Sequence, residues 1–72
     1  MEYDYRKLRG KIIEVFGSQT KFAKALGVSD RTVSLKLNNE RGWTQEEINK
    51  SMTLFDEPSG RIKDYFFTLK VQ

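Results

Sequence analysis

The spacing of Ala23, Gly27 and Val33 restricts the fold more than any other feature of the sequence. Gly27 follows Leu26 at the end of one apolar helical pattern, where a residue that tolerates positive φ can end the helix. A second helical pattern begins three residues after Gly27. Two short helices joined by so short a turn must cross at a steep angle, and only a small side chain such as Ala23 fits at the crossing. The sequence therefore predicts a helix-turn-helix over residues 19–38.

The second helix of this pair is predicted over about residues 30–38, with Ser29 as its N-cap. Val33 and Leu37, four residues apart, mark its inner face. The opposite face then presents a ridge made of Asp30, Arg31, Thr32, Ser34 and Leu35. A ridge of this kind suits the major groove of DNA, and the helix N-terminus adds N–H groups that can bind phosphates.

Glycine and proline breakers divide the rest of the chain into further helix-sized pieces. The first helix is expected to be capped by Asp4, to end at Gly17 and to carry an apolar stripe of Leu8, Ile12, Val15 and Phe16. Thr44 and Glu47 match a capping box, and the helix that follows carries Ile48, Met52 and Phe55.

A last short helix is predicted over residues 59–66, and the alternating tail over residues 67–72 is predicted to be extended. The expected fold is all-α, with about five short helices and an extended C-terminal tail. Its core is expected to contain Phe22, Leu26, Val33, Leu37, Ile48, Met52, Phe55 and Phe66.

The 72 residues leave room for one domain, here residues 1–72. The chain has no cysteine and no histidine, which removes thiolate and imidazole metal sites and the catalytic triads that need them. We therefore expect no enzyme activity, no metal, no cofactor and no small-molecule substrate. No signal peptide or transmembrane run stands out, so we expect no membrane partner and a location in the bacterial cytoplasm.

The net charge of +3 is modest, and the positive surplus lies in the middle third of the chain. Residues 18–44 contain two acidic side chains, Asp30 and Glu40, against five basic ones, namely Lys21, Lys24, Arg31, Lys36 and Arg41. Solvated helix faces of mixed charge would explain most of this distribution, so the charge alone does not indicate a nucleic-acid partner.

Four residues of the motif, Gln19, Ala23, Gly27 and Val33, together with Ser29 after the turn, resemble the helix-turn-helix of phage repressors and Cro proteins, the lambda-repressor-like class. The continuation from residue 35 to residue 48, LKLNNxRxWTxxEI, is similar to small phage-encoded members of that class. The resemblance implies a lambda-repressor-like helix-turn-helix domain. The short length indicates a Cro-like or modulator-type member.

One position departs from the pattern of this class. Three residues after Val33, relatives carry a second core residue, whereas this chain has Lys36. Leu37 is expected to take over the packing through a slight rotation of the helix. Two readings of Lys36 stay open, a phosphate contact or a solvated stem that covers Trp43, which is itself interpreted as a cap on the core.

The resemblance also implies roles for individual residues. The ridge residues Asp30, Arg31, Thr32, Ser34 and Leu35 would read bases. Their chemistry suits Arg31 to guanine, Leu35 to the thymine methyl group and Asp30 to the cytosine amino group, while Thr32 and Ser34 suit phosphates as well. Gln19 would brace the recognition helix. The residues expected to contact phosphates are Gln19, Lys21, Lys24, Lys36, Asn38, Asn39 and Arg41.

Two functions follow as hypotheses. The first is a Cro-like regulator of a phage genetic switch that binds a double-stranded DNA operator as a homodimer and is then associated with the nucleoid. The second is a modulator or antirepressor that binds a partner phage repressor protein, which the low net charge and the carboxylate of Asp30 leave open. Contacts with a second copy or a partner are expected at the C-terminal residues Tyr65, Phe66, Phe67 and Leu69.

Overall fold

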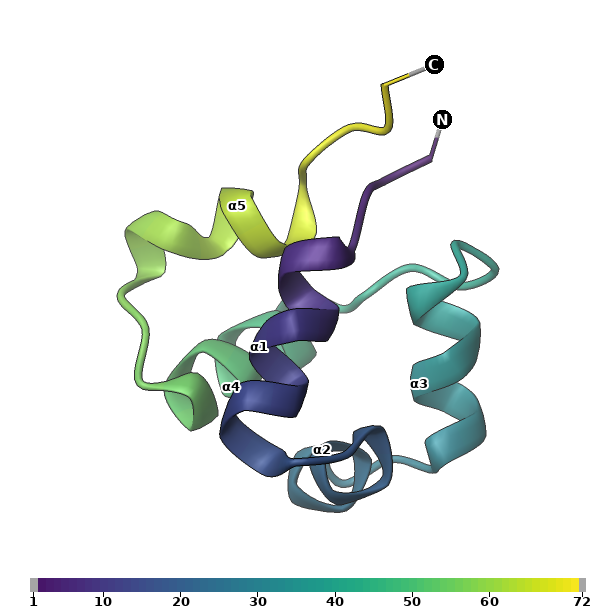
Figure 1. Cartoon of the computed structure of the whole chain (residues 1–72), viewed down its shortest axis with the longest axis vertical. Coiled ribbons are helices and arrows are strands. Elements are labelled where there is room, and N and C mark those ends of the chain that lie inside the picture. Colours follow the sequence, from purple (N-terminus) through teal and green to yellow (C-terminus); the bar gives the residue numbers. More distant parts are fainter. Residues whose placement is uncertain (1, 72) are drawn as a thin grey trace.

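The computed structural model describes residues 2–71, which contain five α-helices and one short 3₁₀ helix (Figure 1). The elements are α1 (Arg6–Phe16), α2 (Gln19–Leu26), α3 (Asp30–Leu37), α4 (Gln45–Phe55), η1 (Ser59–Arg61) and α5 (Ile62–Phe66). The predicted all-α fold with about five short helices is confirmed. None of the helices in residues 2–71 is long and apolar enough to cross a bilayer, and no cluster of acidic side chains within those residues could hold a metal ion.

Hydroxyl side chains cap three of the helices, two of them, Ser29 and Thr44, as predicted from the sequence and the third, Ser18, not predicted. The hydroxyl oxygens of Ser18, Ser29 and Thr44 accept backbone N–H bonds in the first turns of α2, α3 and α4. Glu47 completes the predicted capping box by accepting the N–H of Thr44 at 2.9 Å. At α1 the N-cap position belongs to Tyr5, one residue after the predicted cap, although Asp4 still accepts the N–H of Arg6.

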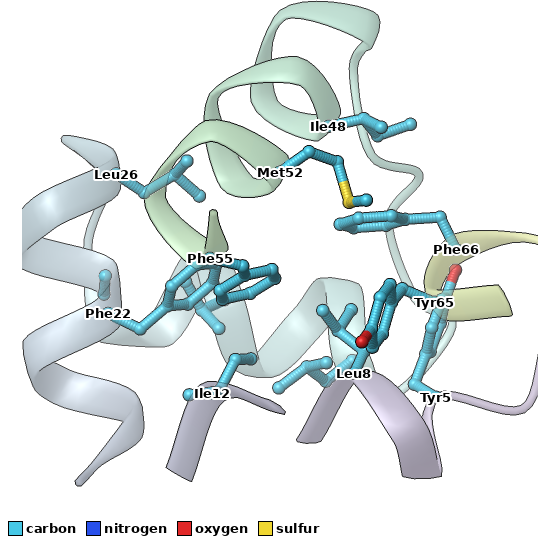
Figure 2. Packing of buried hydrophobic residues seen from close by; sticks show 13 residues of the cluster. Tyr5, Leu8, Ile12, Phe22, Leu26, Ile48, Met52, Phe55, Tyr65 and Phe66 are labelled. Atoms are coloured by element: carbon cyan, nitrogen blue, oxygen red, sulfur yellow. The ribbon is translucent and has the colours of Figure 1, made fainter. Parts of the chain in front are cut away.

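The core lies where α1, α2, α4 and α5 meet, and it is rich in aromatic rings. The Phe22 and Phe55 rings stack with centroids 5.5 Å apart, and Figure 2 shows Ile12 and Leu8 beneath them. All eight predicted core residues are buried. Val15 is 40% exposed and so was wrongly placed in the apolar stripe. The inward stripe of α1 has four-residue spacing, namely Leu8, Ile12 and Phe16, and Val15 falls to its side.

The two ends of the described chain lie side by side (Figure 1). Tyr3 and Leu69 form an antiparallel bridge, in which the Asp4 N–H donates to the Thr68 carbonyl oxygen at 2.7 Å. The Lys70 N–H donates to the Glu2 carbonyl oxygen at 3.1 Å. The predicted extended tail is therefore confirmed for residues 68–70, whereas Phe67 has ψ +24° and ends α5, and Gln72 lies outside the described residues.

Candidate functional site

The bend between α2 and α3 has the geometry that the sequence predicts. Gly27 ends α2 with φ +89°, and its N–H donates to the Ala23 carbonyl oxygen at 2.9 Å. Val28 donates to the same carbonyl at 3.0 Å, which closes the turn. Ala23 is buried at the crossing, and Val33 is fully buried on the inner face of α3. The opposite face of α3, which carries Asp30, Arg31 and Ser34, therefore lies on the surface of the domain.

Polar groups on this outward face already bond to one another within the chain. Gln19 Nε2 donates to Ser34 Oγ at 2.7 Å and to Asp30 Oδ1 at 3.2 Å, so Gln19 braces α3 as the resemblance implied. The Thr32 hydroxyl lies 2.8 Å from Ser29 Oγ. Asp30 and Arg31 are exposed, whereas Thr32, Ser34 and Leu35 are half-buried. The base-reading roles of the five ridge residues stay predictions.

Lys36 does not face solvent, and its predicted phosphate contact is corrected. The side chain is only 6% exposed, and its Nζ lies 2.7 Å from Glu47 Oε1 and 2.8 Å from the Gly42 carbonyl oxygen. The same nitrogen lies 5.7 Å from the ring centre of Trp43. The alternative reading, a solvated stem that covers Trp43, is right only in part: the side chain does lie over Trp43, but its cation is buried and not solvated. Leu37 is buried beside it, as the departure from the family pattern required.

Two opposing effects act on the partner of Lys36. Burial raises the pKa of Glu47, but the hydrogen bonds from Lys36 and from the Thr44 N–H favour the carboxylate and outweigh burial. The net result is a pKa below the ordinary glutamate value. The cation and the carboxylate together hold the end of α3 against the start of α4.

Asn39 is likewise engaged within the chain, although it is half-buried and its predicted phosphate contact stays a prediction. Its backbone has φ +63°, and its side-chain amide pairs with both polar groups of the Tyr3 backbone. Tyr3 N–H donates to Asn39 Oδ1 at 2.9 Å, and Asn39 Nδ2 donates to the Tyr3 carbonyl oxygen at 3.0 Å. Asn38 stays exposed, with its Oδ1 accepting a bond from Arg9 at 3.1 Å.

The cations that remain around the outward face of α3 are few. Within residues 2–71, three predicted cations near this face are exposed and have no ion pair, namely Lys21, Lys24 and Arg31. Arg41 is also exposed and unpaired among these residues, but it lies away from this face, beside Tyr3 and Trp43. Proteins whose DNA binding depends strongly on salt make about 6–10 phosphate contacts. The carboxylate of Asp30 in the first turn of α3 offsets part of the remaining positive charge.

Apolar side chains gather instead where the two ends of the chain meet. Phe67, Leu69 and Val71 alternate along the tail and are 46%, 49% and 96% exposed. Tyr3, opposite Leu69 in the bridge, packs edge-on against Phe67 with ring centres 5.8 Å apart. Trp43 is half-buried and lines the same depression as Tyr3 and Phe67. We call these five residues the terminal apolar surface.

Two of the predicted contact residues are not part of this surface, and this prediction is corrected. Tyr65 and Phe66 are 7% and 1% exposed, because α5 turns them into the core of the same chain (Figure 2). The Phe66 ring packs edge-on against Trp43 at 5.3 Å. The Tyr65 hydroxyl donates to Glu57 Oε2 at 2.9 Å, and Lys11 Nζ lies 2.8 Å from the same carboxylate. Phe67 and Leu69 stay predictions as contact residues.

Sequence reasoning missed Tyr3 and interpreted Trp43 as a cap on the core in preference to a residue that stacks on a ligand. The cap is confirmed, since Trp43 contacts Phe66, Phe22 and Tyr5, but its half-exposed part also belongs to the surface. Burial raises the pKa of Tyr5, and the nearby indole of Trp43 partly opposes that rise. This contact falls short of hydrogen-bond geometry, so the buried indole N–H has no acceptor among residues 2–71. The aromatic residues near both ends of the sequence, such as Tyr3 and Phe67, were the feature that could have indicated this surface.

Comparisons with known proteins agree with the described fold and with the resemblance to small phage regulatory proteins. No curated protein matches the chain. Among solved structures, the chain is similar to the modulator of repression (MOR) of the temperate bacteriophage TP901-1 from Lactococcus lactis. The two share 47% sequence identity with a TM-score of 0.81, over 100% of this chain and 97% of the other. The predicted resemblance to small phage regulatory proteins is confirmed, and the similar protein is a modulator. The model of the DUF739 family, described as proteins of unknown function, matches residues 1–69, and the chain therefore belongs to that family.

Proposed function

We propose that this chain is a phage regulatory protein that modulates repression by binding a repressor protein of the same phage. The observation that carries the proposal is the terminal apolar surface, where the exposed Phe67 packs against Tyr3 and the exposed Leu69 lies opposite Tyr3 in the bridge. Exposed apolar groups that are contiguous mark sites of protein contact in small soluble domains. The likeness to a modulator of repression supports the same function.

The outward face of α3 supports DNA reading less well. Lys36 and Asn39 are held inside the chain, and Gln19 is bonded to Asp30 and Ser34. The polar groups that a DNA reader would offer to bases and phosphates are thus partly satisfied before any ligand arrives. A DNA complex would have to exchange these bonds for new ones, which reduces the gain from binding.

The two surfaces lie at different ends of the molecule. Figure 1 shows both chain ends together at the top, while α2 and the start of α3 lie at the bottom. A repressor bound at the terminal apolar surface would leave Arg31 at the start of α3 uncovered. Binding of the repressor is therefore expected to require neither operator DNA nor Arg31.

The direct test is calorimetry of the purified chain with the repressor of the same phage, with and without operator DNA. We expect binding without DNA, and we expect Arg31→Glu to leave the affinity within about two-fold of the wild-type value, as for residues outside an interface. Absence of binding, in a chain shown to be folded by circular dichroism, would contradict the proposal.

A second candidate is the Cro-like regulator that binds an operator as a homodimer. The bent α2–α3 pair, with Arg31 exposed and unpaired among the described residues, favours it. A gel-shift titration against DNA flanking the gene tests this candidate. Sequence-specific binding at moderate salt that Arg31→Glu abolishes would establish it, since a guanine contact of arginine carries base specificity.

A further inference from the structure

Two depressions flank the exposed ring of Phe67 on the terminal apolar surface. One has a volume of about 300 Å³ and reaches between Tyr3 and Trp43. The other has a volume of about 430 Å³ and is bounded on its far side by Ile62. Both share the side chains of Trp43, Ile48 and Phe67, and Phe67 is the most exposed of the three, so it is the wall of both that a partner would contact first. A partner that covers Phe67 would thus meet two adjoining hollows, one of mixed polarity beside Asn39 and Arg41 and one mainly apolar beside Ile62.

The charge around these depressions is of one sign. Among the described residues that line them, Arg41 is the only charged one, and it is exposed without an ion pair in residues 2–71. The remaining polar lining consists of neutral groups such as Gln45 and Asn49. The site therefore offers donors and a cation but no carboxylate.

We propose that the two depressions receive two neighbouring apolar side chains of the partner repressor, and that a carboxylate beside them pairs with Arg41. This inference rests on the proposed function and specifies the chemistry of the partner segment. A second copy of the chain fits less well, because its exposed apolar tail carries Lys70 between Leu69 and Val71 and would bring a cation towards Arg41. An arginine that pairs with a carboxylate at the edge of an apolar contact supplies both orientation and selectivity.

The test uses the full chain and two matched pairs of variants. Phe67→Ala removes the exposed wall that both depressions share, and Ile13→Ala removes an equally exposed apolar side chain of α1 (46% against 55% exposed). Arg41→Glu reverses the charge at the site, and Arg31→Glu reverses that of another unpaired, exposed arginine, at the start of α3. Circular dichroism checks that all four variants fold, and calorimetry with the repressor gives their affinities.

We expect Phe67→Ala and Arg41→Glu each to weaken repressor binding about ten-fold or more, as central anchors of interfaces do, and both control variants to change it less than about two-fold. The weakening by Arg41→Glu should also be smaller at high salt, because screening reduces the contribution of the charge pair. Trp43 is the only tryptophan, so 5-fluorotryptophan labels this site alone. Its ¹⁹F resonance should shift when unlabelled repressor is added.

The outcomes separate this inference from the function on which it rests. If the repressor binds but only Arg31→Glu weakens the complex, or if the ¹⁹F resonance does not move, the depressions are not the docking site although the proposed function stands. If a folded wild-type chain does not bind the repressor at all, the proposed function fails and this inference fails with it. If Phe67→Ala weakens binding and Arg41→Glu does not, the acidic partner segment is ruled out.

Discussion

The outward face of α3 and the terminal apolar surface are both exposed, yet they are built in opposite ways. The first comes from one continuous stretch, residues 19–35, and is polar and partly self-bonded. The second is assembled from three distant segments, which contain Tyr3, Trp43 and Phe67, and is apolar. The comparison teaches that a helix-turn-helix can keep its shape while the surface best suited to a partner lies elsewhere on the domain.

Lys36 links the two regions, and its replacement is expected to have the largest effect. Lys36→Ala should lower the free energy of unfolding by about 3 kcal/mol, because Glu47 would be left largely buried without its cation. Lys36→Met restores the packing of the apolar stem but also leaves Glu47 without its cation, so it should recover only the packing part of the loss. Urea unfolding of both variants measures the difference. A Lys36→Ala variant as stable as wild type would mean that Lys36 is a solvent-facing cation after all.

Asn39 supports only the terminal apolar surface, and its loss should be the next largest effect. Asn39→Ala removes two hydrogen bonds to Tyr3 and places alanine at φ +63°, so we expect a loss of about 2 kcal/mol. Asn39→Gly removes the bonds without the strain and should cost about half as much. Amide exchange at Lys70, which bonds to Glu2, should become faster in both variants. Unchanged exchange would show that the bridge does not depend on Asn39.

Gly27 supports only the α2–α3 bend. Gly27→Ala should cost about 1–2 kcal/mol, because a residue with a Cβ is strained at φ +89°. The added Cβ would lie 3.7 Å from Lys50 Nζ, an ordinary contact, so the cost reports the backbone alone. Gly42→Ala, in open space without positive φ, is the matched control and should change stability by less than about 0.5 kcal/mol. Equal melting temperatures for the two variants would argue against a tight left-handed turn.

The smallest expected effect is a dependence of stability on acid. The pKa of Glu47 is lower in the folded chain than its ordinary value of 4.5, so the ionised form stabilises the fold. This contribution is complete above that ordinary value and is lost as the pH falls through the lower, folded pKa. The fall in melting temperature between pH 7 and pH 3 should thus be smaller in Glu47→Gln than in Glu46→Gln, a neighbouring exposed carboxylate. Identical falls would exclude Glu47 as a contributor.

The helix boundaries and the bend could be predicted because their causes are local. Ser29 caps α3, and Gly27 ends α2, through contacts that span at most four residues. The burial of Lys36 could not be predicted in the same way, because its partner Glu47 is eleven residues away and belongs to another helix. Asn39 and Tyr3 are separated by thirty-six residues, which is further still from any local pattern.

The short last helix shows a different limit of sequence reasoning. Tyr65, Phe66 and Phe67 are consecutive aromatic residues, and a helix of five residues has too few turns to show which of them faces inward. Packing against Trp43 and Glu57 decides the matter in favour of Tyr65 and Phe66. The surface residue Phe67 is thereby left to cover Tyr3.

The pairing of Glu2 with Lys70 has a practical consequence for anyone who handles this protein. A purification tag or a fused reporter at either end would lie next to Tyr3 and Leu69 and could block a partner from binding there. The same proximity means that a short peptide could join the two ends, with new ends opened at the exposed residues Ser59 and Gly60. In such a circularly permuted chain, tags would be attached near Ser59 and Gly60, and the terminal apolar surface would stay accessible to a partner during titration.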